Sequence, residues 1–160
     1  MKLKELLNGI RVIEMTADPE LEIGHVAYDS RKVHSGGMFV AIAGFASDGN
    51  RFIPMAMEKG AAAVLCSRKV GDYPAIYVED PRIALGMIAR EELKRIGCKS
   101  VGVTGSVGKS TTKEMISTVL ETTFRTAKTP ANHNNDIGMP MGILAMPEDT
   151  QVAVLEMGMN

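Results

Sequence analysis

The sequence predicts an α/β fold with parallel strands, in which a small amino-terminal α/β module precedes the start of a second, Rossmann-like module. Short apolar runs alternate with segments of helical periodicity along the chain. A strand-like run at 100–104 leads directly into a glycine-rich loop and then into a helical segment. The composition, 45% hydrophobic and 23% charged over 160 residues, is that of a globular protein with a substantial core.

In the first module, an amphipathic helix is expected over 2–13, where Leu3 and Leu6 begin a helical repeat and Gly9 marks its end. A second helix is expected over 52–59, because its apolar residues share one face and a glycine follows it. Apolar runs bounded by Gly and Asp are expected to form strands at 25–28, 38–42, 62–65 and 75–78.

The longest helical pattern covers 81–96 and is closed by Gly97, so the domain boundary is placed between 1–97 and 98–160. The later elements are expected as strands at 100–104, 124–126 and 152–156 and helices at 111–120 and 140–146. Lys113 and Glu114 are expected on the solvated face of the first of these helices. Because no helix follows the last strand to cover it, the second domain is expected to be incomplete.

The charge balance argues against a nucleic-acid partner, since 18 basic residues are interleaved with 19 acidic ones for a net charge of -1. No long apolar stretch follows the amino terminus, so we expect no membrane insertion and a cytoplasmic location. Cys66 and Cys98 have neither a metal-ligand spacing nor a CxxC spacing. Both are expected to be reduced, buried thiols.

The strongest functional signal is the segment Thr104-Gly105-Ser106-Val107-Gly108-Lys109-Ser110-Thr111. Its glycines allow backbone conformations in which successive N–H groups point at phosphate oxygens. Lys109 adds a positive charge toward the β- and γ-phosphates, and Ser110, at the start of a helix, offers a hydroxyl to Mg²⁺. The pattern predicts ATP or GTP binding, although Val103 stands where the generic motif has glycine. The alternative is a glycine-rich turn that binds nothing.

This loop resembles the phosphate loop of the Mur ligase family, TG-[ST]-x-GK-[ST]-[ST], which also lacks the generic first glycine. Three upstream segments, Asp29-Ser30-Arg31, 37–41 and Asp48-Gly49-Asn50, resemble the DSR, G-x-[LM]-F-V-A and DG-[HN] elements of the family's amino-terminal domain. The resemblance implies a UDP-N-acetylmuramoyl-peptide-binding domain at 1–97. It implies the beginning of the central ATP-binding domain, a P-loop ATPase domain, at 98–160.

Segment 129–140 resembles the GN-x-NN-x-IG-x-P element of the family members that add D-alanyl-D-alanine, and 154–159 resembles their E-[ML]-G-[MA] element. The resemblance implies an ATP-dependent ligase acting on UDP-N-acetylmuramoyl-tripeptide in peptidoglycan precursor synthesis. In such a ligase, ATP phosphorylates the terminal carboxylate of the peptide, and the amine of the incoming dipeptide attacks the acyl phosphate. The 160-residue chain is expected not to turn over by itself.

The resemblance also assigns roles to residues of this sequence. Lys109 would hold the transferring phosphoryl group, and Glu156, at the carboxyl end of a strand, would bind Mg²⁺ together with Ser110. The candidates for binding ATP and its phosphates are Thr104, Gly105, Ser106, Gly108, Lys109, Ser110 and Thr111. The candidates for binding the UDP-linked substrate are Ser30, Arg31, Asp48, Gly49, Asn50, Asn134 and Asn135.

Each candidate outside the loop also has a purely structural interpretation. Glu156 could be a solvated carboxylate at a strand end, and Asn134 and Asn135 could be turn or capping residues. Arg31 could form a surface ion pair, and 48–50 could be a polar turn.

Three functional hypotheses therefore stay open. The first is the ATP-dependent ligase. The second is a non-catalytic UDP-sugar-binding module, or a Mur ligase that adds a single amino acid. The third is an unrelated P-loop phosphotransferase, which the Asp29-Ser30-Arg31 segment disfavours.

Overall fold

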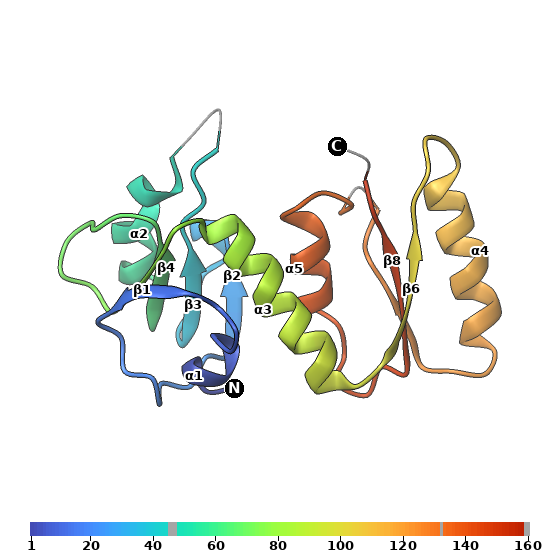
Figure 1. The fold of residues 1–160 in the computed structure, drawn as a ribbon, viewed down its shortest axis with the longest axis horizontal. Helices are drawn as coiled ribbons and strands as arrows, with labels where there is room; N and C mark the ends of the chain where they lie inside the picture. The colour runs from blue at the N-terminus through green and yellow to red at the C-terminus, as the bar shows by residue number, and fades with distance from the viewer. Residues whose placement is uncertain (45–47, 132, 159–160) are drawn as a thin grey trace. The chain divides into compact units, whose positions relative to one another are not determined.

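The computed structural model describes residues 1–44, 48–131 and 133–158 of the chain. The chain divides into two compact units, Met1–Ile88 and Ala89–Asn160, and the division falls inside helix α3 (Pro81–Ile96), which Figure 1 labels. The carboxyl-terminal half of α3 belongs to the second unit because Ala89, Leu93 and Ile96 pack into that unit's core. Helix α3 itself has the bounds expected from the sequence.

The first unit is built on a five-stranded sheet with the order β1-β5-β4-β3-β2. Its four neighbouring strands β5, β4, β3 and β2 are parallel, and β1 pairs antiparallel with β5 at one edge. The strands are β1 (Val12–Met15), β2 (His25–Ala27), β3 (Gly37–Val40), β4 (Ala63–Cys66) and β5 (Ala75–Val78). The helical segments are α1 (Leu3–Leu6), α2 (Ile53–Glu58) and two 3-10 turns, η1 (Ser30–Lys32) and η2 (Gly49–Phe52).

The prediction of a long amino-terminal helix over 2–13 is wrong. Helix α1 ends at Leu6, and Gly9 takes a left-handed φ of +74° that redirects the chain. Val12 then starts an edge strand that pairs with Val78. Hydrogen bonding to a strand far away in the sequence thus decides the conformation of residues that also fit a helical repeat.

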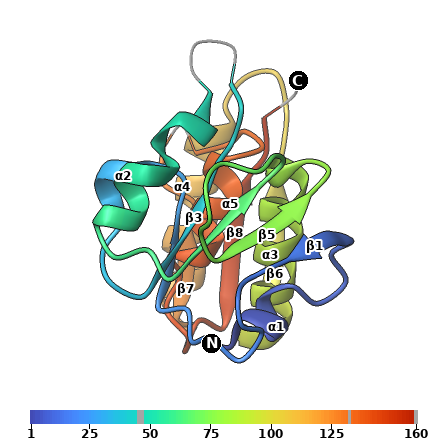
Figure 2. The same ribbon diagram turned by 90° about the vertical axis from the view of Figure 1, so that its left-hand side faces the viewer.

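Strands β3, β4 and β5 are buried at every position and form the centre of the first unit. Phe39 is fully buried in a cluster that also contains Val64 of β4 and Ile53 and Ala56 of α2. Helix α2 therefore packs its apolar face on the sheet, and Figure 2 shows it beside β3. Gly60 ends the helical region with a φ of +92°, as expected.

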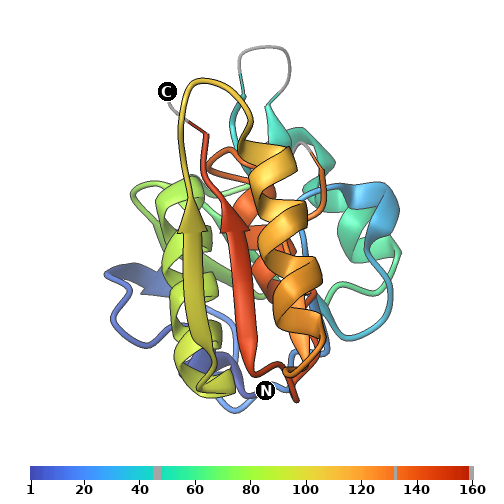
Figure 3. The ribbon, with the colours of Figure 1, turned by 90° about the vertical axis from the view of Figure 1, so that its right-hand side faces the viewer.

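The second unit contains a three-stranded parallel sheet in the order β6-β8-β7. Helices α4 and α5 lie on opposite sides of β8, and Figure 3 shows α4 beside the parallel strands β6 and β8. These elements are β6 (Lys99–Val103), α4 (Lys109–Glu121), β7 (Thr126–Lys128), α5 (Gly138–Leu144) and β8 (Val152–Glu156). The α/β fold with parallel strands is confirmed, and β8 has its predicted bounds.

Burial along β8 explains how the site described below is positioned. Ala153 and Leu155 belong to the core cluster that includes Ile143 of α5, whereas Glu156 contacts residues of α4. The strand thus presents alternate side chains to its two helices. In the part of the chain that the structure describes, no helix is both long and apolar enough to cross a membrane.

The cysteines were both expected to be buried, and this holds for one of them. Cys66 is buried in β4, and burial raises the pKa of its thiol. Cys98 is only half-buried, because it lies in the short connection between α3 and β6. Both are free thiols.

A pair of glycine substitutions in the first unit tests this packing. A Cβ at Gly49 would lie 2.5 Å from the carbonyl oxygen and 2.7 Å from the amide nitrogen of Ile42, whereas a Cβ at Gly86 in α3 would meet nothing within 4 Å. Gly49→Ala should therefore lower the free energy of unfolding by roughly 1–3 kcal/mol. Gly86→Ala should leave it unchanged or raise it by up to about 1 kcal/mol. Urea denaturation followed by circular dichroism measures both, and equal stability of the two variants would contradict the packing described for Gly49.

Candidate functional site

The loop between β6 and α4 has the backbone conformation that its glycines predict. Gly105 has a φ of +149° and Gly108 a φ of +79°, both unfavourable for residues with a Cβ. Gly108 directly precedes α4, whose first residue is Lys109. The Lys109 ammonium lies over the loop and donates to the carbonyl oxygen of Gly105 at 2.6 Å. The loop, the lysine and the positive end of the helix dipole therefore lie together, which is the arrangement that favours a bound phosphate.

A polar pocket of about 310 Å³ opens at this loop. Its lining residues come from the loop, the first turn of α4, the segment before α5 and the end of β8. They are Gly108, Lys109, Ser110, Thr111, Asn134 and Glu156. The tertiary structure thus brings together residues that lie up to 48 positions apart in the sequence, from Gly108 to Glu156.

Glu156 lines this pocket and is only 2% exposed, so it is not a solvated carboxylate at a strand end. Its Oε1 accepts from the Asn134 amide at 3.0 Å, and its Oε2 accepts from the Ser110 hydroxyl at 2.9 Å. The hydrogen bond from Asn134, with further ones from Ser110 and Lys113, holds the pKa of Glu156 below its ordinary value despite burial. The carboxylate is therefore kept ionised beside the loop.

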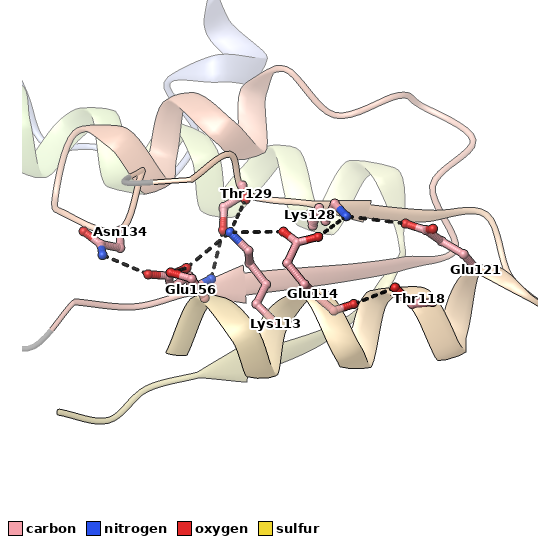
Figure 4. Close-up of polar contacts among 9 residues, drawn as sticks. Lys113, Glu114, Thr118, Glu121, Lys128, Thr129, Asn134 and Glu156 are labelled. Atoms are coloured by element: carbon pink, nitrogen blue, oxygen red, sulfur yellow. Dashed lines mark hydrogen bonds and ion pairs between the residues drawn. The ribbon is translucent and has the colours of Figure 1, made fainter. Parts of the chain in front are cut away.

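Lys113 was expected on the solvated face of α4, and this prediction is wrong. Its side chain is 1% exposed, and its Nζ lies 3.2 Å from Glu156 Oε2 and donates to the carbonyl oxygen of Thr129 at 2.9 Å (Figure 4). The reason is helical geometry, since Lys113 stands three residues after Ser110 and shares its face toward β8. That spacing was a signal available in the sequence. Glu114 is exposed, as predicted.

Thr129 is a second residue that sequence reasoning missed. It is fully buried, and its hydroxyl accepts from the backbone N–H of Glu156 at 2.9 Å while its carbonyl accepts from Lys113. One residue of the segment after β7 therefore holds both members of the ion pair. No motif in the sequence marks this role.

The two asparagines of the loop before α5 have different environments. Asn134 donates to Glu156, whereas Asn135 Oδ1 accepts from the backbone N–H groups of Ile137 and Gly138 at the start of α5. The contacts of Asn135 are those of a turn and capping residue. Asn132 and Met159, which belong to the motifs used in the sequence analysis, lie outside the described residues.

In the first unit, Ser30 and Arg31 lie in η1, next to α2. Ser30 is buried, with its hydroxyl 3.4 Å from the sulfur of Met55. Arg31 is exposed and forms a bidentate ion pair with Asp29, through Nε at 3.0 Å and Nη2 at 2.8 Å. The hydrogen bonds from Arg31 lower the pKa of Asp29 to about 2. A surface ion pair thus accounts for the position of Arg31 in this structure.

The segment 48–50 comprises Asp48, the N-cap of η2, and the first two residues of that turn, which directly precedes α2. Asp48 Oδ1 accepts from the backbone and side-chain amides of Asn50 at 3.0 and 2.7 Å, and Oδ2 pairs with Arg68. The hydrogen bonds from Asn50 lower the pKa of Asp48. Gly49 packs against the backbone of Ile42. These contacts are those of a tightly built polar turn.

The residues at the phosphate-type loop fit a magnesium ion. Ser110 Oγ and the Glu156 carboxylate are hard oxygen donors 2.9 Å apart on the wall of one pocket, and Mg²⁺ takes such ligands together with phosphate oxygens and water. Among the described residues, no group of three or more His, Cys, Asp or Glu lies together to hold a metal ion unaided. A cation at Ser110 and Glu156 would therefore need ligands in addition to these two side chains.

A strand, a glycine-rich loop carrying Lys109 and Ser110, and a buried acidic strand end define a nucleotide-binding α/β protein of the P-loop class. Profiles of two domains match the chain: "Mur ligase family, catalytic domain" over residues 22–93 and "Mur ligase middle domain" over residues 103–160. The chain belongs to the Mur ligase family, and the resemblance drawn from its sequence is confirmed.

Several relatives in Bacillus subtilis, Synechocystis and Escherichia coli carry the name UDP-N-acetylmuramoyl-tripeptide--D-alanyl-D-alanine ligase. The chain is 46% identical over 151 residues to UDP-N-acetylmuramoyl-tripeptide--D-alanyl-D-alanine ligase of Bacillus subtilis, covering 90% of this chain and 33% of that protein. The solved structure of the UDP-N-acetylmuramoylalanyl-D-glutamyl-2,6-diaminopimelate--D-alanyl-D-alanyl ligase from Acinetobacter baumannii superposes with a TM-score of 0.88 at 31% identity, over 100% of this chain and 36% of that one.

MurF ligase from Thermotoga maritima in complex with ADP superposes with a TM-score of 0.80 at 37% identity, over 86% of this chain and 32% of that one. The chain thus spans about a third of the length of the relatives it matches.

The Asp29–Arg31 contact allows a direct test by pH titration. The pKa of Asp29 is about 2 in the folded chain against an ordinary value of 3.8, so Arg31→Gln should return it toward 3.8. Because the folded value is the lower one, the contribution of this contact to stability is full above about pH 4 and is lost as the pH falls through about 2. Carboxyl chemical shifts followed by NMR measure the change. A pKa that stays near 2 in Arg31→Gln would refute the ion pair, and Lys69→Gln, which removes an exposed charge paired with Asp72 and not with Asp29, is the control.

Proposed function

We propose that this chain forms part of an ATP-dependent ligase that adds D-alanyl-D-alanine to UDP-N-acetylmuramoyl-tripeptide, a step in peptidoglycan precursor synthesis. The observation that carries the proposal is the placement of Glu156 against Ser110, beside Lys109 and the phosphate-type loop. The names of the most similar relatives support the choice of substrates. A cytoplasmic location is part of the same proposal.

The proposed reaction needs charge neutralisation more than a nucleophilic side chain. The terminal carboxylate of the UDP-linked peptide attacks the γ-phosphorus of ATP, ADP leaves, and an acyl phosphate forms. The amine of D-alanyl-D-alanine then attacks the acyl carbon, and phosphate leaves as the amide bond forms. Mg²⁺, held by Ser110 and Glu156, would supply positive charge to the phosphates.

The residues of this chain take complementary parts in that scheme. Lys109 holds the transferring phosphoryl group in place of its present contact with the Gly105 carbonyl. Asn134 keeps the Glu156 carboxylate turned toward the pocket. Backbone N–H groups and hydroxyls around the nucleotide come from Thr104, Gly105, Ser106, Gly108, Ser110 and Thr111.

The first module, taken as residues 1–97, is proposed to hold the UDP-linked precursor, and residues 98–160 to begin the ATP-binding domain. Ser30 and Asn50 are buried in the 3-10 turns η1 and η2, which both contact α2, and with Arg31, Asp48 and Gly49 they are the residues proposed to bind this ligand. The Asn50 Oδ1 atom is buried and has no hydrogen-bond partner among the described residues, which supports a role in binding. Asn134 and Asn135 of the second unit are proposed to contact the same UDP-linked substrate.

A second candidate function applies to the chain as it stands. The first unit has its own sheet and core, so it can bind a UDP-sugar without catalysing anything. Because the chain spans about a third of its relatives' length, we propose that turnover requires the remaining two thirds.

Binding to the first module is tested by calorimetric titration of the 160-residue chain with UDP-N-acetylmuramoyl-tripeptide. We expect measurable binding of this ligand and weak or no binding of Mg-ATP. The double variant Ser30→Ala, Arg31→Ala should lower the affinity for UDP-N-acetylmuramoyl-tripeptide at least about tenfold. The reason is that one charge-assisted and one neutral hydrogen bond to the ligand are removed. Lys69→Ala is the matched control on an exposed cation of the same unit. Unaltered affinity in the double variant would exclude Ser30 and Arg31 from the site.

Turnover is tested in the chain extended to the length of its relatives. Lys109→Ala should reduce kcat by at least about a hundredfold, since a preorganised charge on the transferring group is lost, and should leave the affinity for the UDP-linked substrate unchanged. Lys128→Ala, which removes a half-buried cation paired with Glu114, should retain the wild-type rate. Phosphate release measures both variants. A normal rate in Lys109→Ala would remove the loop from the mechanism.

A further inference from the structure

Lys113 is a buried cation that the proposed reaction does not use. Its side chain is 1% exposed and that of its partner Glu156 is 3% exposed, so both charges are removed from water. Burying a charge is costly unless an opposite charge and hydrogen bonds compensate it. Here the Thr129 carbonyl at 2.9 Å and Glu156 Oε2 at 3.2 Å provide that compensation, with Glu114 Oε1 farther away at 3.9 Å.

The Lys113 ammonium contacts the same oxygen of the Glu156 carboxylate as the Ser110 hydroxyl does. Glu156 Oε2 accepts from Ser110 Oγ at 2.9 Å and lies 3.2 Å from Lys113 Nζ, while Oε1 is taken by Asn134. The carboxylate is thus already neutralised by the protein. A divalent cation that binds without nucleotide would replace the hydrogen bond from Ser110 to Glu156. It would also lie close to the Lys113 ammonium, and the two positive charges would repel each other.

Nucleotide phosphates change this balance. Their negative charges would enter at Lys109 and the start of α4, and would compensate the charge of an accompanying cation. The electrostatic obstacle is therefore specific to a cation that comes without phosphate.

We propose that Lys113 is a positioning residue and built-in counter-ion for Glu156, which disfavours a free divalent cation at Ser110 and Glu156 and admits one together with nucleotide phosphates. This inference rests on the proposed function, because it presumes that the pocket takes a metal-bound nucleotide. It adds that the cation binds together with the nucleotide and not before it. Lys113, which lies outside the phosphate loop, determines this order.

The test is titration of the 160-residue chain with Mn²⁺ in the absence of nucleotide, followed by electron paramagnetic resonance of the free ion. The wild-type chain should bind only in the millimolar range or more weakly. Lys113→Met should bind at least about tenfold more tightly, since a repelling charge next to the carboxylate has been removed. Lys113→Arg keeps the charge and should bind as weakly as wild type.

Two control variants locate the effect. Lys128→Met removes a cation from the same unit that pairs with Glu114 and not with Glu156, so it should leave Mn²⁺ affinity unchanged. Lys113→Met combined with Glu156→Gln should lose the added affinity. The inference is overturned if wild type binds Mn²⁺ in the micromolar range, if Lys113→Met gains nothing, or if the gain survives in the double variant.

Loss of Lys113 leaves a buried carboxylate without its counter-ion, so Lys113→Met can be unstable. In that case Mn²⁺ should replace the ammonium, and should raise the melting temperature or restore the far-ultraviolet circular dichroism of this variant more than those of wild type. No such rescue would count against the inference, and the wild-type titration decides it independently. Binding of UDP-N-acetylmuramoyl-tripeptide, whose proposed contacts do not include Lys113, reports separately on the proposed function.

Discussion

The buried ion pair between Lys113 and Glu156 is the interaction on which the second unit's site depends. It joins the second turn of α4 to the carboxyl end of β8, and Thr129, in the segment after β7, hydrogen-bonds to both partners. Breaking a buried pair by removing one partner leaves an uncompensated charge, so the arrangement of these three elements is tightly constrained. Ser110 and Asn134 are positioned relative to one carboxylate as a result.

This constraint complements that of the glycine-rich loop. Gly105 and Gly108 give the backbone its curvature, and α4 begins directly after it, so Lys109 and Ser110 have positions determined by the main chain. Glu156 reaches the same pocket through parallel pairing of β8 with β6, in which Val103 and Glu156 are partners. A local motif and a sheet register thus converge on one site.

The first unit follows a different principle. Its candidate residues lie in two short 3-10 turns that adjoin α2, and their polar groups are largely engaged with one another. Asp29 caps η1 and Asp48 caps η2, each by accepting from the backbone N–H two residues later. The repeated aspartate therefore has a structural role that is independent of any ligand.

Much of this protein was determined by local sequence. Helix α3 and strands β5 and β8 have the bounds that apolar periodicity predicts, and the loop before α4 has the conformation that its glycines require. Only the tertiary structure decided the rest, because pairing and burial depend on residues far apart in the chain. Strand pairing makes Val12 the start of an edge strand, and packing against β8 buries Lys113, which the sequence predicted to be exposed. The fold also gives adjacent asparagines different contacts, because Asn134 donates to Glu156 whereas Asn135 caps the start of α5. A helical repeat shows which residues share a face. Whether that face is exposed to solvent or buried depends on the neighbouring strand, here β8 with the charged side chain of Glu156.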